Sequence, residues 1–149
     1  MRAVAQRVTR AGVTVGGEAV GRIGAGLLAL IGAEDGDTER DAAYLAEKLI
    51  GLRVFDDAGG RMNRSVRDAG GAILIVSQFT LLGDVRHGKR PSYDKAARPE
   101  LAEPLIEGLA ERIRAAGVPV ETGRFRAEMA VESINDGPVT ILLDSRKAF

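Results

Sequence analysis

The first part of the chain alternates hydrophobic and polar residues with the period of a β-strand. This pattern predicts three short strands, at residues 2–9, 12–15 and 18–23. Gly16 and Gly17 lie between the last two and can adopt the positive φ angles of a tight hairpin turn. The run that follows, at residues 27–31, is apolar at every position and predicts a strand that is buried on both faces.

A helix is predicted next. Apolar residues recur every three or four positions between residues 38 and 52, and Asp37 or Thr38 can accept hydrogen bonds from the free N–H groups of the first turn. A turn at residues 56–60 follows, and residues 72–76 then form a second fully apolar run. Like the first such run, this one predicts a central strand.

The second predicted helix follows a long polar loop. Residues 82–98 show no periodicity, and loops of this length in compact domains are usually functional or mobile. Apolar residues at helical spacing then share one face over residues 105–113, and Gly117 marks the C-terminal end. Because proline is tolerated only in the first turn of a helix, Pro104 predicts that the regular helix begins near Glu103.

The chain closes with three more strand-like segments, at residues 118–125, 127–134 and 139–143. Residues 135–138 are Asn-Asp-Gly-Pro, each of which favours a turn between the last two segments. The element order is therefore three strands, then strand and helix twice, then three strands. It predicts a single domain over residues 1–149 of class α/β or α+β, layered β/β/α.

Composition excludes several kinds of chemistry. The 149 residues contain no cysteine, which excludes disulfides, a thiolate nucleophile, iron–sulfur clusters and cysteine-bound zinc. His87 is the only histidine, so no metal site with two imidazoles can form, and we expect neither a metal nor a cofactor. Twenty-one basic residues balance twenty-one acidic ones, so any contact with nucleic acid must be local.

The sequence shows no membrane or targeting segment. The longest largely apolar stretch, residues 23–33, is well below the roughly 18 residues that cross a membrane. Polar residues interrupt the N-terminus too early for a signal sequence. We therefore expect a cytoplasmic protein with no membrane contact.

The apolar run at residues 72–76 ends abruptly in polar side chains. Ser77, Gln78 and Thr80 follow it, and in an extended chain Gln78 and Thr80 would share a face. Ligands often bind beyond the ends of strands, although strands also end in polar residues for no catalytic reason.

The long loop concentrates positive charge around the only histidine. Arg86, Lys89 and Arg90 lie within five residues together with His87. Such a cluster can contact the phosphates of a nucleic acid, or it can be a solvated loop. No neighbour in the sequence orients His87 as a base, which favours a surface histidine.

Two motifs resemble those of the D-aminoacyl-tRNA deacylase family, in the form found in bacteria and many eukaryotes. They are Ser-Gln-Phe-Thr-Leu at residues 77–81 and Asn-x-Gly-Pro-x-Thr at residues 135–140. Other stretches similar to the family extend the resemblance essentially from end to end, at residues 6–11, 24–28, 62–63, 90–93 and 122–125. The chain departs from the family at Tyr93, where phenylalanine is usual, and at Arg126, where a small residue is usual.

The resemblance implies an activity and an assembly. Members of this family hydrolyse the ester that joins a D-amino acid, or glycine, to the 3′-terminal adenosine of tRNA. They work as homodimers with the active sites at the interface. By this resemblance the chain is expected to proofread chirality in translation and to hydrolyse glycyl esters mischarged on tRNA-Ala, with the aminoacylated 3′ end of tRNA as its partner.

The resemblance also implies roles for substrate-binding residues. Most bonds before proline are trans, which the sequence alone favours for Gly137-Pro138, whereas in the family this bond is cis and faces the partner subunit's pocket. Its carbonyls then exclude an L side chain, and Asn135 belongs to the same motif. Phe125 and Met129 match the family's adenine pocket, although core packing explains them almost as well.

Thr80 is the natural candidate for a nucleophile, but the two motifs hold no base except Asp136. We therefore expect the backbone N–H groups near Phe79 and Thr80 to form an oxyanion hole, while the 2′-hydroxyl of the substrate assists water. Ser77 and Gln78 would position the adenosine or hold the loop.

Two alternatives remain open at this point. A threonine-nucleophile esterase or amidase would need His87 or Asp136 against Thr80. A non-catalytic nucleic-acid adaptor on the same scaffold would bind RNA or DNA through the basic loop and release no amino acid.

Overall fold

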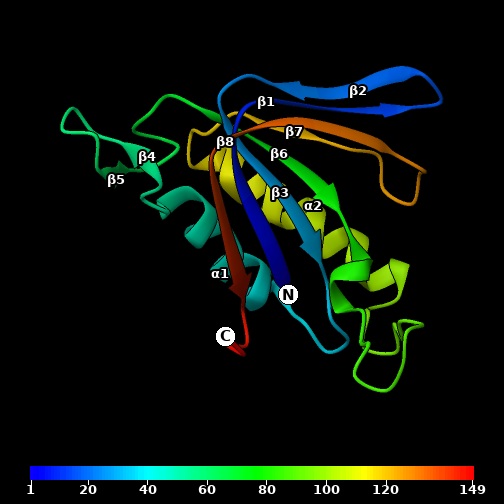
Figure 1. Cartoon of the computed structure of the whole chain (residues 1–149). Coiled ribbons are helices and arrows are strands. Elements are labelled where there is room, and N and C mark those ends of the chain that lie inside the picture. Colours follow the sequence, from blue (N-terminus) through cyan, green and yellow to red (C-terminus); the bar gives the residue numbers. More distant parts are fainter.

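A computed structural model describes all 149 residues as a curved, six-stranded sheet with two helices on one face and a small separate hairpin (Figure 1). The elements, in chain order, are β1 (Arg2–Val15), β2 (Glu18–Ile23), β3 (Gly26–Gly32), α1 (Glu39–Gly51), β4 (Phe55–Asp56), β5 (Met62–Arg64), β6 (Ala72–Ser77), the 3-10 helix η1 (Phe79–Leu82), α2 (Pro99–Ala115), β7 (Val120–Thr122) and β8 (Ala130–Asp144). Neither α1 nor α2 has the length and apolar character of a membrane-spanning helix.

Strand β1 organises the sheet because it pairs along both of its edges. Its first half pairs with β3 and its second half with β2, both antiparallel. Strand β8 follows the opposite edge of β1 over almost its whole length (Figure 1). Beyond β3, the strands β6 and β7 continue the sheet in parallel.

The sheet has a hydrophobic core on each face, which explains its continuous apolar runs. In β6, Ile73 packs in the core that α1 and α2 cover, whereas Leu74 packs in the second core against β1 and β2. Strand β1 passes from one core to the other, with Ala3 in the first and Val13 in the second. The sheet therefore folds over itself, and the predicted α/β class with β/β/α layers is confirmed.

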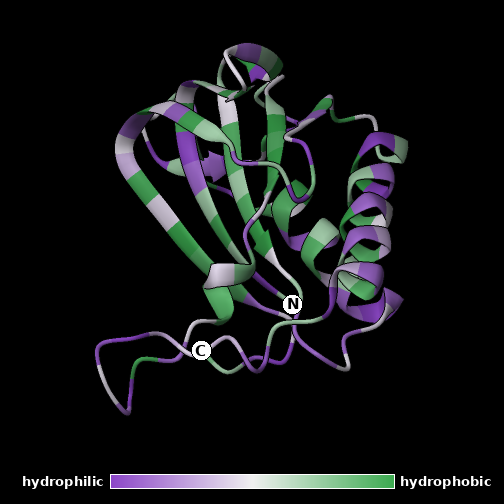
Figure 2. Cartoon of the chain, turned by 90° about the vertical axis from the view of Figure 1, so that its right-hand side faces the viewer, coloured by the Kyte–Doolittle hydropathy of each residue, from purple (hydrophilic) through white to green (hydrophobic).

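The helices turn hydrophobic sides towards the sheet and hydrophilic sides away from it (Figure 2). Helix α1 begins after the cap Thr38, as predicted. Helix α2 begins at Pro99, earlier than the predicted start near Glu103. Pro99 fits the first helical position, where no N–H is needed, and Pro104 lies on the exposed side, where water can bind the carbonyl that it leaves unpaired.

Two predicted breaks between strands are wrong. Residues 2–9 and 12–15 belong to the single strand β1, because Arg10 and Ala11 also pair with β8. The segments predicted at 127–134 and 139–143 likewise belong to one strand, β8, so no hairpin turn separates them. Sequence patterns also missed the short hairpin of β4 and β5.

The residues predicted to form that turn bulge out of the sheet instead. Gln6 pairs with Thr140 and Val8 with Asn135, so residues 136–139 of β8 lie opposite the single residue Arg7 of β1. The Gly137-Pro138 peptide bond in this bulge is cis. The resemblance implied that isomer, and the sequence alone did not.

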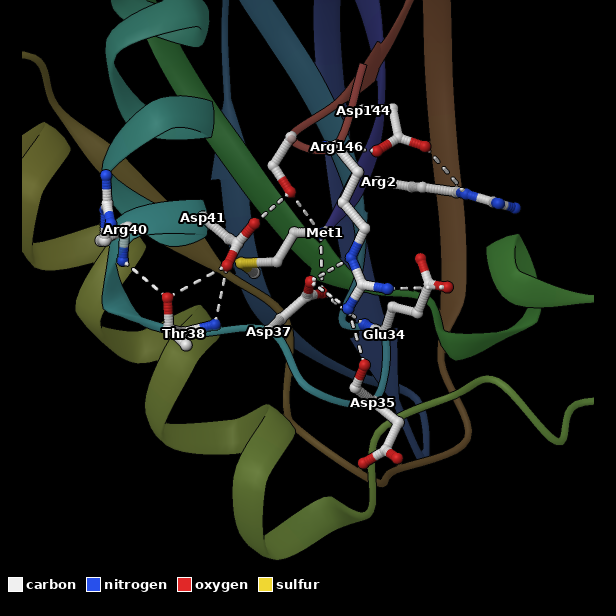
Figure 3. Close-up of polar contacts among 11 residues, drawn as sticks. Met1, Arg2, Glu34, Asp35, Asp37, Thr38, Arg40, Asp41, Asp144 and Arg146 are labelled. Carbon is white, nitrogen blue, oxygen red and sulfur yellow. Dashed lines mark hydrogen bonds and ion pairs between the residues drawn. The ribbon is translucent and has the colours of Figure 1, made fainter. Parts of the chain in front are cut away.

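Ion pairs join the two ends of the chain to the start of α1 (Figure 3). The Met1 ammonium group lies 2.6 Å from the carboxylate of Asp37, and both are fully buried. Arg146 contacts the same carboxylate at 3.1 Å and Glu34 at 3.2 Å. Burial lowers the pKa of Arg146, but these carboxylates outweigh burial and its pKa is raised.

Candidate active site

A cavity of about 670 Å³ opens beside the carboxyl end of β6. Four segments line it, namely the end of β3, residues 76–79, the start of α2 with the loop before it, and residues 125–131. Thirteen of its nineteen lining residues are hydrophobic, and no acidic residue is among them. This size and apolar character are typical of small-molecule sites and suit a nucleoside.

The chain changes direction at the end of β6, which exposes two backbone donors. Helix η1 starts at Phe79, so Gln78 and Thr80 do not share an extended face as predicted. The first hydrogen bond of η1 runs from the Leu81 N–H to the Gln78 carbonyl at 3.2 Å. The N–H groups of Phe79 and Thr80 therefore have no acceptor within the helix.

Glycine at position 32 allows η1 to pack this closely against β3. A Cβ atom at Gly32 would lie 2.8 Å from the Gln78 carbonyl oxygen and 2.6 Å from a methyl group of Leu82. Gly32 also lines the cavity. The end of β3 thus fixes the position of the two free donors.

The Thr80 hydroxyl has no base as a partner. Its oxygen accepts a hydrogen bond from the Gln78 amide. The carboxylate of Asp136 instead pairs with Arg7 at 3.3 Å, and His87 makes no hydrogen bond. Neither base that a threonine nucleophile would need is hydrogen-bonded to Thr80 in this chain.

The long loop is anchored to the cavity and forms part of its wall. The ring of Tyr93 packs edge-on against Phe79, with the ring centroids 5.1 Å apart. The loop then bonds to the residues after β3, through Asp35 N–H to the Lys95 carbonyl and Ala97 N–H to the Ala33 carbonyl. These contacts place Tyr93 and Arg98 in the lining.

The basic cluster of the loop is only partly free. Hydrogen bonds from the guanidinium and the backbone N–H of Arg86 hold the pKa of Asp84 far below its usual range. The charge of Arg86 is therefore neutralised locally. Lys89 and Arg90 are exposed and form no ion pair.

The cavity brings together five of the predicted site residues, which are Ser77, Gln78, Phe79, Phe125 and Met129. Phe125 and Met129 also pack against the two cores, so the binding and packing explanations both hold. The lining does not include the other predicted residues, which are Thr80, Arg86, Lys89, Arg90, Asn135, Gly137 and Pro138. No three His, Asp or Glu side chains converge where they could share a metal ion.

The Gly137-Pro138 bulge is held by Arg7, a residue to which the sequence gave no role. Arg7 is 8% exposed, and its Nε lies 3.2 Å from the Asp136 carbonyl oxygen and 3.3 Å from its carboxylate. Its Nη1 donates to the Val54 carbonyl at 2.7 Å. The bulge is exposed and lies outside this chain's own cavity lining. The only signal in the sequence was an arginine at an inward-facing position of a strand.

Known proteins resemble the chain in sequence and in fold. The family model described as D-Tyr-tRNA(Tyr) deacylase matches residues 4–144. The D-aminoacyl-tRNA deacylase of Symbiobacterium thermophilum is 63% identical over 149 residues, covering 100% of this chain and 99% of the relative. The relative of the same name in Koribacter versatilis is 60% identical and covers 100% of both chains.

Two solved structures superimpose over nearly the whole chain. The c-Myc DNA Unwinding Element Binding Protein matches with a TM-score of 0.91 and 43% identity, covering 97% of this chain and 98% of that one. A probable eukaryotic D-amino acid tRNA deacylase matches with a TM-score of 0.79 over 95% of this chain and 97% of that one. At 18% identity, the second match shows a shared fold.

Proposed function

The chain belongs to the D-Tyr-tRNA(Tyr) deacylase family and is a hydrolase of D-aminoacyl-tRNA, and from this premise we propose how its own residues carry out the reaction. The observation that carries the proposal is the pair of free backbone N–H groups at Phe79 and Thr80, beside a cavity of nucleoside size. No histidine or acidic side chain lines the cavity beside them, so we assign the catalysis to backbone dipoles.

The reaction needs only water and stabilisation of negative charge. Water attacks the carbonyl carbon of the ester, and the oxygen that becomes negative accepts hydrogen bonds from the Phe79 and Thr80 N–H groups. The 2′-hydroxyl of the terminal ribose orients the water. It accepts a proton from the attacking water and donates its own proton to the leaving 3′-oxygen. The products are the free amino acid and tRNA. Ser77 and Gln78 position the adenosine, whose base packs against Phe125 and Met129.

Selection by handedness requires a second copy of the chain. The Gly137-Pro138 bulge projects from the sheet and lies outside the cavity lining of its own chain. In a homodimer the bulge reaches the partner's cavity, where its carbonyl groups meet an L side chain but leave a D side chain free. A glycyl ester has no side chain to exclude, so glycyl-tRNA, including that mischarged on tRNA-Ala, is also hydrolysed. Aminoacyl-tRNA as substrate places the work in the cytoplasm.

Deacylation of matched substrates tests this function. One tRNA is charged with the D and the L form of the same amino acid, and a third sample carries glycine. The D-aminoacyl and glycyl esters should be hydrolysed and the L ester spared. Equal rates for both enantiomers would contradict the steric account of the Gly137-Pro138 bulge.

The same assay separates the two alternatives to this function. A non-catalytic adaptor would bind tRNA without releasing any amino acid. The similarity to the c-Myc DNA Unwinding Element Binding Protein is the observation that favours this alternative. A threonine-nucleophile esterase would instead leave a covalent acyl group on Thr80, which mass spectrometry of the quenched reaction would reveal.

A further inference from the structure

The cavity contains two charged side chains that the proposed mechanism does not use. Arg98 and Arg126 are the only charged residues in its lining. Both are exposed, so they lie at the open side of the cavity. Neither forms an ion pair or a side-chain hydrogen bond, whereas Arg2, Arg7 and Arg146 are each paired with a carboxylate. Two positive charges that line one cavity without counterions favour an anionic ligand.

The backbone presents both side chains at this opening. Arg98 is the N-cap residue of α2, immediately before its first turn and at the positive end of the helix dipole. Pro99 at the first helical position leaves few free N–H groups there, so the guanidinium and not the helix end is the main donor. Arg126 has a φ of +64°, a left-handed conformation that is unfavourable for a residue with a side chain. The local fold thus gains nothing from arginine at this position.

The substrate narrows the choice of anion. The aminoacyl group carries a positive α-ammonium group, which arginine would repel. The ribose and adenine are neutral, so the negative charges nearest the ester are the phosphates that precede the terminal adenosine. Guanidinium groups bind phosphate through paired, charge-assisted hydrogen bonds.

We propose that Arg98 and Arg126 bind the backbone phosphates next to the 3′-terminal adenosine and so position the ester at the Phe79 and Thr80 N–H groups. The inference rests on the proposed function, because it assumes an aminoacylated RNA end in the cavity. It assigns the tRNA contact to the rim of the cavity, in addition to the more distant basic cluster of the loop. Arg98 and Arg126 are therefore binding residues that set KM.

The experiment compares D-aminoacyl-tRNA with the D-aminoacyl ester of adenosine, which carries the same ester but no phosphate. Arg98→Gln and Arg126→Gln should each raise KM for D-aminoacyl-tRNA about three- to tenfold and leave kcat near the wild-type value. For the D-aminoacyl ester of adenosine, which has no phosphate, the same variants should match the wild type. The slope of log KM against log salt concentration should decrease by about 0.7 for each arginine removed.

Further variants separate phosphate binding from a structural role. Arg126→Lys should recover part of the affinity because it restores the charge, whereas Arg126→Gly should lose the affinity while its melting temperature equals or exceeds that of the wild type. Arg40→Gln serves as the matched control, since Arg40 is an exposed arginine on α1 without an ion pair. It should change neither KM nor the salt slope.

The outcomes distinguish this inference from the function on which it rests. If the wild type fails to hydrolyse D-aminoacyl-tRNA, the proposed function is wrong. If the wild type is active but Arg98→Gln and Arg126→Gln keep its KM and salt slope, the function stands and the phosphate assignment is overturned. An equal loss on tRNA and on the adenosine ester would also overturn it, because the arginines would then act on the nucleoside.

Discussion

Replacing the Thr80 side chain distinguishes a backbone oxyanion hole from a nucleophilic hydroxyl. The proposed reaction uses its backbone N–H, and its hydroxyl meets only the Gln78 amide. Thr80→Ala should therefore lower the single-turnover rate by less than about tenfold, whereas loss of one oxyanion donor typically costs about 10²–10³ in rate. Gln78→Ala provides the comparison for loss of the same hydrogen bond. A Thr80→Ala protein with no measurable activity, but normal melting, would favour a nucleophilic hydroxyl.

The space around Gly137 has no room for a methyl group, because Arg7 and Val139 pack against it. A Cβ atom there would lie 3.1 Å from Arg7 Nη2 and 2.9 Å from a Val139 methyl group, at a φ of +117° that favours glycine. Gly137→Ala should displace the carbonyls of the bulge and lower the ratio of D to L hydrolysis at least about tenfold. The ratio of the two rates under identical conditions measures this effect.

Gly16→Ala is the matched control for the Gly137 variant. Gly16 also has a positive φ, of +57°, but no atom lies within 4 Å of the position that a Cβ atom would occupy there. Its replacement should lower stability modestly and leave the D to L ratio unchanged. If both alanine variants keep wild-type discrimination, the bulge does not select handedness.

Asp41 takes part in two structures. It belongs to the capping box of α1, and it accepts a hydrogen bond from Ser145 in the C-terminal segment. Burial raises its pKa, but hydrogen bonds from the Ser145 hydroxyl and from Thr38 outweigh burial, so its pKa is lowered from 3.8. A carboxyl whose folded pKa is depressed adds stability above its unfolded pKa and loses it as the pH falls through the folded value.

Acid unfolding should therefore depend on Asp41. The urea midpoint of the wild type should fall as the pH drops below about 4, where the Asp41 carboxyl of the unfolded chain binds a proton before that of the folded chain does. Asp41→Asn should be less stable at pH 7 by about 0.5–2 kcal/mol, the usual cost of losing a helix cap, and should show a shallower acid limb. Parallel acid limbs in the two proteins would show that other carboxylates govern the transition.

At the scale of elements, local patterns predicted most of the fold. The two apolar runs correctly predicted the strands β3 and β6. The helical spacing of apolar residues and the Thr38 cap correctly predicted α1. Local patterns failed at residues 135–138, whose composition favours a turn, because pairing with β1 on both sides of the bulge keeps β8 continuous. They also missed the role of Arg7, which depends on partners 47 and 129 residues away. The motif residues were recognisable, but their separation between the cavity and the bulge was expected only from the family resemblance and not from local patterns.

Over the whole molecule, β8 presents a surface that a single chain leaves uncovered. It pairs with β1 along one edge and with no strand along the other. Val131, Ile134 and Leu142 on this strand are 39%, 47% and 59% exposed. Val131 also lines the cavity, so the apolar surface is continuous with the proposed active site. An exposed edge with such side chains is suited to contact with a second copy of the chain.

A charge on this surface should separate the two copies and, with them, remove the selection of handedness. We expect the wild type to have the mass of two chains by light scattering at micromolar concentration, and Leu142→Asp to have the mass of one. Because the separated chain keeps its own cavity but loses the partner's Gly137-Pro138 bulge, it should hydrolyse L-aminoacyl-tRNA as well as D-aminoacyl-tRNA, while its circular dichroism stays unchanged. Leu101→Asp is the control, since Leu101 is similarly exposed, at 54%, but lies on α2 outside the cavity lining. It should remain a dimer with full activity. A fully active Leu142→Asp monomer that still spares L-aminoacyl-tRNA would mean that each chain selects handedness alone, through groups other than the bulge on β8.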